Sequence, residues 1–322
     1  MPMDIAKHVD AIWSAFVTTL PPDLCHEARV LARAVGLVPV AGIPWSNVFK
    51  NEVTLAAPSL LSTAMPLATT QMVMNATTAH MLAVIDAFAV DRMLDRQATG
   101  GRQIQRLLEH MRGARNRAIR ELTGEQPSPY TECEYDSYCA ISTERLLLQH
   151  GVPLSFSDYS RLSLAKQAVA FPASMALAKA AGWGGRRQRA VQRVLRGIAL
   201  GLQFQDDVVD WEEDWRNGGA WAVCLYRGLR GPEATLPDDT FDLPSLRGKI
   251  HASKVLATMM NMSRLRYREA QRIASFLGAA SLAAWARDQE AKATELTQCE
   301  ADHAGYAVRA HQLSNWAMEV FG

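Results

Sequence analysis

Helical periodicity is the feature that most limits what this chain can fold into. Apolar residues recur at spacings of three and four along nearly its whole length, and runs that alternate apolar with polar residues are almost absent. Such spacing lines one face of an α-helix, whereas a half-buried strand requires alternation. Alanine, leucine and arginine, which favour helices, are abundant. The sequence therefore predicts an all-α protein.

Proline and glycine clusters divide this pattern into segments of helix length. We expect about ten helices, with breaks allowed inside the last two, near residues 5–19, 24–36, 46–62, 67–97, 102–122, 132–149, 157–181, 186–215, 245–277 and 280–319. The proline-rich, acidic stretch from Gly228 to Pro244 is expected to be a surface loop. Because no obvious linker or internal repeat interrupts the helices, we predict a single large helical domain over residues 1–322.

Composition limits the partners. Hydrophobic residues make up 48% of the chain and the net charge is +1, so a large core is expected, and no overall positive field favours nucleic acid or an anionic membrane. Charges interrupt the first apolar positions, and no uncharged apolar run reaches the ~20 residues that span a bilayer. We expect a cytoplasmic protein without a transmembrane segment. The five cysteines contain no CxxC pair, so neither a disulfide framework nor a zinc site is indicated.

The acidic segment from residue 203 to 214 is the most informative part of the chain. Its members at helical spacing are Gln203, Asp206, Asp207, Asp210 and Asp214. Along one face of a helix, like charges at these spacings repel by roughly 0.2–0.5 kcal/mol per pair. A bridging cation removes this repulsion, and Mg²⁺ prefers hard oxygen ligands. The pattern predicts a Mg²⁺–diphosphate site with the four aspartates as metal ligands.

The alternative interpretation of this segment is a solvated, acidic helix end. Its neighbours argue against that interpretation, because Leu200, Phe204 and Trp211 are apolar. We expect Val208 and Val209 to turn away from the carboxylates, towards the core.

The same segment carries a family resemblance. Residues 199–210 resemble the second aspartate-rich motif of trans-prenyl diphosphate synthases, G-x-x-F-Q-x-x-D-D-x-x-D. Four residues match it: Gln203, Asp206, Asp207 and Asp210. Ala199 and Leu202 replace the glycine and the phenylalanine. The spacing from Asp210 to Asp214 is also similar to the D-x-x-E-D of squalene and phytoene synthases.

The chain thus resembles the class I isoprenoid synthase superfamily, over roughly residues 80–215. The resemblance implies one helical bundle with a central cavity, an allylic prenyl diphosphate substrate and two or three Mg²⁺ ions. It makes Asp207 and Asp210 catalytic and gives Gln203 a role in substrate binding. Upstream, Lys166-Gln-Ala resembles the K-T-A segment whose lysine contacts the substrate diphosphate, and Phe171 follows it as a lining residue.

The resemblance also implies an earlier H-D-D-x-x-D motif, and here the chain departs from the family. Placing Asp91 on the third aspartate puts Ala87 and Phe88 where the paired aspartates belong. The remaining pair, Asp91 and Asp95, is similar to the D-x-x-x-D of squalene and phytoene synthases and of related terpene cyclases. We assign both as catalytic metal ligands, with Asp86 as a further ligand.

Basic and aromatic residues complete the predicted site. Arg92 and Arg96 offer planar donors suited to diphosphate, and Phe88 would line the cavity and shield a carbocation. The structural alternative is that Asp91 and Asp95 pair with these arginines on an exposed face. We expect residues 83–96 and 198–214 to face each other across the central cavity.

These features favour a terpene synthase or cyclase that ionises one allylic diphosphate. The G-G-K-R segment that binds isopentenyl diphosphate in prenyl synthases has no counterpart around Lys50, which argues against chain elongation. Three alternatives stay open: a squalene- or phytoene-like condensing enzyme, a chain-elongating prenyl transferase, and a catalytically silent prenyl-binding or partner subunit. A homodimer is one of the assembly states that stay open.

Overall fold

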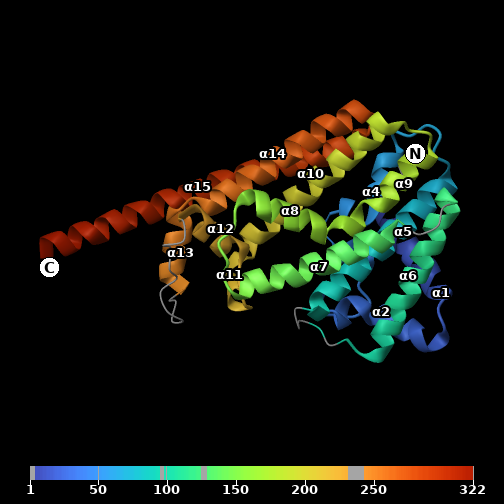
Figure 1. The fold of residues 1–322 in the computed structure, drawn as a ribbon, viewed down its shortest axis with the longest axis horizontal. Helices are drawn as coiled ribbons and strands as arrows, with labels where there is room; N and C mark the ends of the chain where they lie inside the picture. The colour runs from blue at the N-terminus through green and yellow to red at the C-terminus, as the bar shows by residue number, and fades with distance from the viewer. Residues whose placement is uncertain are drawn as a thin grey trace. The chain divides into compact units, whose positions relative to one another are not determined.

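The structure is a computed structural model that describes residues 4–49, 51–94, 98, 100–124, 129–230 and 243–321, with side chains described as far as Tyr306 and at Arg309. The described residues form helices and no strand (Figure 1), which confirms the all-α prediction. In chain order the helices are α1 (Ile5–Thr18), α2 (Pro22–Ala34), α3 (Trp45–Val48), α4 (Val53–Ser62), α5 (Thr70–Leu94), α6 (Arg102–Thr123), α7 (Tyr130–Gln149), α8 (Phe156–Lys166), the 3₁₀ helix η1 (Ala168–Ala170), α9 (Pro172–Ala180), α10 (Gly185–Val209), α11 (Trp211–Arg216), α12 (Trp221–Arg230), α13 (Leu243–Ala252), α14 (Val255–Leu277) and α15 (Ala280–Phe321).

Several of the expected helices are divided in the structure. Pro172 starts α9, because its ring favours a first helical position and disfavours the helix interior. Lys254 takes a left-handed conformation with φ 62°, which ends α13 before α14 begins. The last predicted helix is unbroken. Helix α12 was not predicted. The loop expected over 228–244 is wrong at both ends, because residues 228–230 end α12 and residues 243–244 begin α13; residues 231–242 lie outside the described residues.

The described chain divides into two compact units. Unit 1 comprises residues 1–142, 165–195 and 273–283, and unit 2 comprises residues 143–164, 196–272 and 284–322. The chain passes between the units several times, so neither is a continuous stretch of sequence. The single-domain organisation stays a prediction, as does the expected arrangement of residues 83–96 against 198–214.

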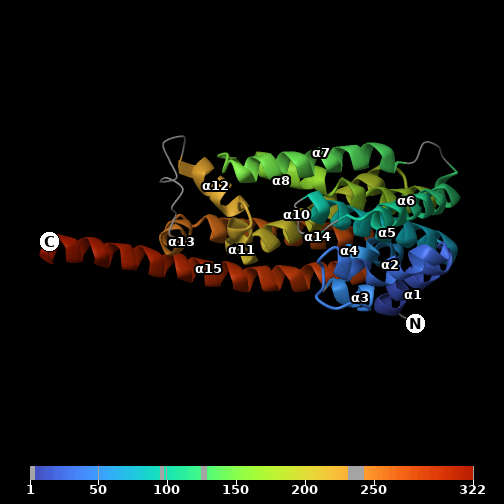
Figure 2. The same cartoon turned by 90° about the horizontal axis from the view of Figure 1, so that it is seen from below.

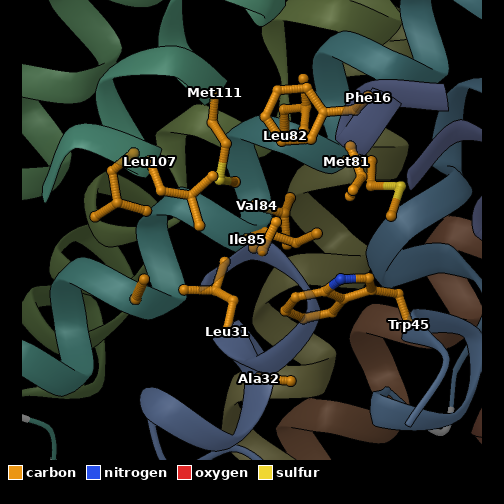
Figure 3. Close-up of a cluster of buried hydrophobic side chains, with 14 of the residues drawn as sticks. Phe16, Leu31, Ala32, Trp45, Met81, Leu82, Val84, Ile85, Leu107 and Met111 are labelled. Atoms are coloured by element: carbon orange, nitrogen blue, oxygen red, sulfur yellow. The ribbon is translucent and has the colours of Figure 1, made fainter. Parts of the chain in front are cut away.

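Unit 1 is organised around α5. Met81, Leu82 and Ile85 of this helix lie in one buried cluster with Leu107 and Met111 of α6 (Figure 3). By length and composition α5 alone among the described helices could cross a membrane, yet 72% of its most apolar window is buried in the structure. A helix that is apolar on all sides fits such a core position.

His80 links α5 to α4 by a buried polar contact. Its ring Nε2 lies 3.0 Å from the carbonyl oxygen of Thr54, and only 2% of the residue is exposed. Burial lowers the pKa of His80 to about 4. The imidazole is therefore neutral near pH 7 and serves packing within unit 1.

Unit 2 depends on a close approach between α10 and α14. The Ser263 hydroxyl donates to the carbonyl oxygen of Gly201 at 2.7 Å, and the fully buried ring of Tyr267 lies against Gly201 itself. A β-carbon at position 201 would stand 2.6 Å from Tyr267 Cε1. The glycine is thus required by packing, and it lies two residues before Gln203 of the acidic segment.

The substitution Gly201→Ala should lower the free energy of unfolding by about 1–3 kcal/mol, the usual cost of overpacking a core. Gly248→Ala on α13 is the matched control, since a β-carbon at position 248 would meet no atom within 4 Å and alanine favours a helix by up to ~1 kcal/mol. Chemical denaturation of both variants checks this. Equal stability of the two would mean that α14 can move away from α10 at little cost.

Candidate active site

The acidic segment spans the end of α10 and the start of α11. Asp206 and Asp210 are exposed, Asp214 is half-buried, and Asp207 is only 5% exposed. Asp210 lies between the two helices with φ −103° and ψ 5°. Of the adjacent pair at 206 and 207, the structure therefore places Asp206 at the surface and Asp207 in the core of unit 2.

The two valines of this segment differ in the same way. Val208 is 7% exposed and packs in the core, as expected, but Val209 is 62% exposed. The expectation for Val209 is wrong: Asp207 and Val208 form the buried side of this turn, and Val209, about 100° further round the helix, lies at the surface with Asp206 and Asp210.

Asp207 is held by two side chains of unit 2. The Tyr159 hydroxyl, from α8, donates a short hydrogen bond to Oδ2, and Gln203 Nε2 donates to Oδ1 at 2.8 Å. Both carboxylate oxygens therefore accept a donor from the protein. Gln203, predicted to bind substrate, contacts Asp207, and nothing in the sequence pattern indicated Tyr159.

Burial dominates the electrostatics of Asp207. It raises the pKa of the carboxyl well above its usual range, and the hydrogen bonds from Tyr159 and Gln203 act in the opposite direction. The pKa of the Tyr159 phenol is also raised, by burial first and then by the neighbouring Asp207. The tyrosine thus keeps its proton and remains a donor.

In unit 1, Asp91 and Lys166 meet. Lys166 Nζ lies 3.4 Å from Asp91 Oδ1, and each side chain is 20% exposed. The Ser137 hydroxyl donates to the backbone oxygen of Lys166 at 2.6 Å, which fixes the end of α8 against α7. The structure therefore brings together two residues predicted to share a site from 75 positions apart, while Asp95 and Arg96 lie outside the described residues. Arg92 is half-buried near the end of α5.

Asp86 belongs to a buried charge cluster. Arg112 Nε, on α6, donates to Asp86 Oδ2 at 2.9 Å and lies 3.7 Å from Glu134 Oε1 of α7. Glu134 also accepts from Arg115 at 2.5 Å, and the Arg115 guanidinium stands 4.4 Å above the ring of Tyr130. Burial raises the pKa of Asp86, while Arg112 opposes the shift. The aspartate predicted as a further metal ligand thus has an arginine as its partner.

The two predicted lining aromatics are both half-buried. The ring of Phe88 lies 4.8 Å from the ring of Phe49, centre to centre, and Phe49 stacks on Trp45. Phe88 therefore ends a row of aromatic rings that packs against the core of unit 1. Phe171 stands at the N-terminal end of α9.

One of three comparisons with known proteins found a similar fold. No protein-family model matches the chain, and no curated protein matches it by sequence. Among solved structures it is similar to a polyprenyl synthetase from Streptomyces coelicolor A3(2), with a TM-score of 0.66 and 14% identity, over 88% of this chain and 97% of that one. At this identity the likeness is one of fold. The chain has the helical fold of the isoprenoid synthase type, as the sequence resemblance implied.

The raised pKa of Asp207 predicts how stability changes with pH. The folded state holds this proton more tightly than the unfolded chain, so the contribution is complete below about pH 4, the ordinary aspartate pKa, and is lost as the pH rises through the folded-state value. Replacing Asp207 with Asn removes this loss. The melting temperature of Asp207→Asn minus that of the wild type should therefore increase from pH 4 upwards.

Thermal unfolding of Asp207→Asn and of the wild type at a series of pH values measures this difference. A difference for Asp207→Asn that shrinks as the pH rises would show that the ionised carboxylate is the stabilising form.

The stability of a variant without Arg112 should show how unfavourable the burial of the Asp86 carboxylate is without a cation. Arg112→Leu leaves that carboxylate without its cation and should destabilise the protein by about 2 kcal/mol, since the arginine is half-exposed and water replaces it in part. Arg106→Leu is the matched control on α6, because its pair with Asp23 is exposed on both sides and should change stability by at most ~1 kcal/mol. If urea denaturation showed equal losses of unfolding free energy for Arg112→Leu and Arg106→Leu, Arg112 would not be the group that stabilises the buried Asp86 carboxylate.

Proposed function

We propose that this protein is a Mg²⁺-dependent class I terpene synthase that ionises an allylic prenyl diphosphate. The observation that carries the proposal is the exposed pair Asp206 and Asp210 in an aspartate-rich segment, on a fold similar to that of a polyprenyl synthetase. The substrate, the metal and the reaction class all belong to this proposal, as does the cytoplasmic location; the assembly state stays open, with a homodimer as one possibility.

The exposed carboxylates of unit 2 suit a magnesium ion. Asp206 and Asp210 offer hard oxygen ligands four residues apart. Asp207 suits it less, because both its oxygens accept hydrogen bonds from the protein. We therefore assign Asp207 to positioning: it fixes the last turns of α10 against α8. When bound, the ion would neutralise diphosphate oxygens and make the diphosphate a better leaving group.

In unit 1 we assign Lys166 to diphosphate binding. Its side chain is only 20% exposed and its ammonium is held beside Asp91, so the ammonium is already restricted in position before an anion binds. Asp91 then orients a cation in addition to its predicted role as a metal ligand. A cationic group placed in advance lowers the cost of ordering it on binding.

Two other functions have a specific observation in their favour. Chain elongation is favoured by the name of the structural neighbour, a polyprenyl synthetase, although Ala87 and Phe88 replace the paired aspartates of that activity's motif. A catalytically silent role is favoured by the cations that already partner Asp86 and Asp91. Squalene- or phytoene-like condensation stays open from the sequence pattern.

One experiment separates these functions. The protein is incubated with C10, C15 and C20 allylic diphosphates and Mg²⁺, with and without labelled isopentenyl diphosphate, and released diphosphate and products are measured. We expect a hydrocarbon or alcohol from one allylic substrate alone. Incorporated label would identify a prenyl transferase, a head-to-head product would identify a condensing enzyme, and no diphosphate release from any substrate would favour the silent role.

The acidic variants test the residue assignment. Asp206→Asn and Asp210→Asn should each lower kcat about 100-fold or more, a typical loss when one charge-stabilising group is removed, because the amide keeps the shape but not the charge. Glu213→Gln is the control, since it removes an exposed carboxylate of α11 outside the motif. Full activity in both aspartate variants would refute the metal assignment.

A further inference from the structure

Unit 2 holds a second group of candidate metal ligands besides the aspartates, in a pocket that Asp210 also lines. His251 comes from the end of α13, and Glu300 and His303 come from α15. In both views α13 lies next to α15, at a steep angle to it (Figures 1 and 2). One ligand atom from each residue lies within 4.8 Å of the others. The proposed function makes no use of these three side chains.

The distances within the group fit a tetrahedral ion. His251 Nδ1 lies 3.2 Å from Glu300 Oε2, and His303 Nδ1 lies 3.5 Å from Glu300 Oε1. Bonds of 2.0–2.1 Å from a zinc ion to nitrogen and oxygen place neighbouring tetrahedral ligands about 3.4 Å apart. Small rotations of the glutamate would bring one of its oxygens to both histidines.

The hydrogen bonding of the group is incomplete. His251 Nδ1 and Glu300 Oε2 are shielded from solvent, and despite their 3.2 Å separation neither makes a hydrogen bond of acceptable geometry. Buried polar atoms without partners are uncommon and costly. A metal ion between them would be coordinated by the lone pair of His251 Nδ1 and by one of Glu300 Oε2. The present contact between these two atoms satisfies neither.

The chemistry of the ligands selects the metal. Imidazole nitrogen favours Zn²⁺, Co²⁺ or Ni²⁺, whereas Mg²⁺ favours oxygen alone. Glu300 and His303, three residues apart, lie on one face of α15, a spacing that carries metal ligands in helical bundles. In the sequence, the Glu-x-x-His pattern at 300–303 supplies only two of the ligands. The third, His251, comes from α13 and is brought near them only by the fold.

We propose that His251, Glu300 and His303 bind a divalent transition-metal ion of the zinc class, which links α13 to α15. All three residues line a pocket of about 650 Å³ whose wall also includes Trp211 and Arg247. The fourth coordination position therefore opens to this pocket and is filled by water or by an anionic ligand that enters it. The bound ion would hold the end of α13 against α15.

Metal binding is measured on the full chain after dialysis against a chelator. Titration calorimetry with Zn²⁺ should give one equivalent, and Co²⁺ should give the visible absorption of a four-coordinate site. His303→Gln, His251→Gln and Glu300→Gln should each weaken binding at least ~10-fold. His110→Gln, an exposed histidine on α6, is the control with wild-type affinity. Zn²⁺ should raise the melting temperature of the wild type and of the control only.

His303→Gln should fold, since the side chain of His303 is 52% exposed, and thermal melting without metal establishes folding for each variant. Absence of zinc binding by the wild type, or wild-type affinity in both His303→Gln and Glu300→Gln, would overturn the proposal. The assay requires no prenyl substrate, so its result is independent of the proposed function. Millimolar Mg²⁺ should not displace the zinc.

Discussion

The burial of one carboxylate in the core of each unit is the constraint on which the arrangement of the surrounding helices depends. A desolvated, unpaired charge costs several kcal/mol, so the surrounding helices must supply donors. In unit 1, α6 provides Arg112 for Asp86. In unit 2, α8 provides Tyr159 for Asp207, and α10 itself provides Gln203. These contacts determine how α5 meets α6 and how α10 meets α8.

In the proposed function, the same constraint gives the aspartates different roles. An aspartate whose oxygens already accept hydrogen bonds inside the core gains little from a metal ion, and it serves instead to hold its helix. Asp206 and Asp210, one turn apart and exposed, are accessible to an ion and a diphosphate. In this view Asp207 contributes rigidity: it keeps its exposed neighbours on a helix end that is anchored in the core of unit 2.

Two kinds of metal ligand lie close together in unit 2. Asp210 lines the same pocket as His251 and His303, but carboxylates and imidazoles select different ions. The proposed chemistry needs the oxygen ligands, while the proposed zinc-class ion needs the nitrogen ligands and holds α13 against α15. Helix spacing explains both groups, since each combines residues three or four positions apart on one face.

The sequence by itself determined the all-α class, most helices and the likeness to isoprenoid synthases, because periodicity, breakers and the 203–210 motif are local patterns. It also predicted that Asp91 and Lys166 belong together. Only the tertiary structure decided which acids are buried, because neighbours 206 and 207 differ solely in what packs against them. The partners Tyr159, Arg112 and His251 lie 26 to 49 positions from the residues they contact. No local pattern encodes such pairings, since they arise when separate helices meet.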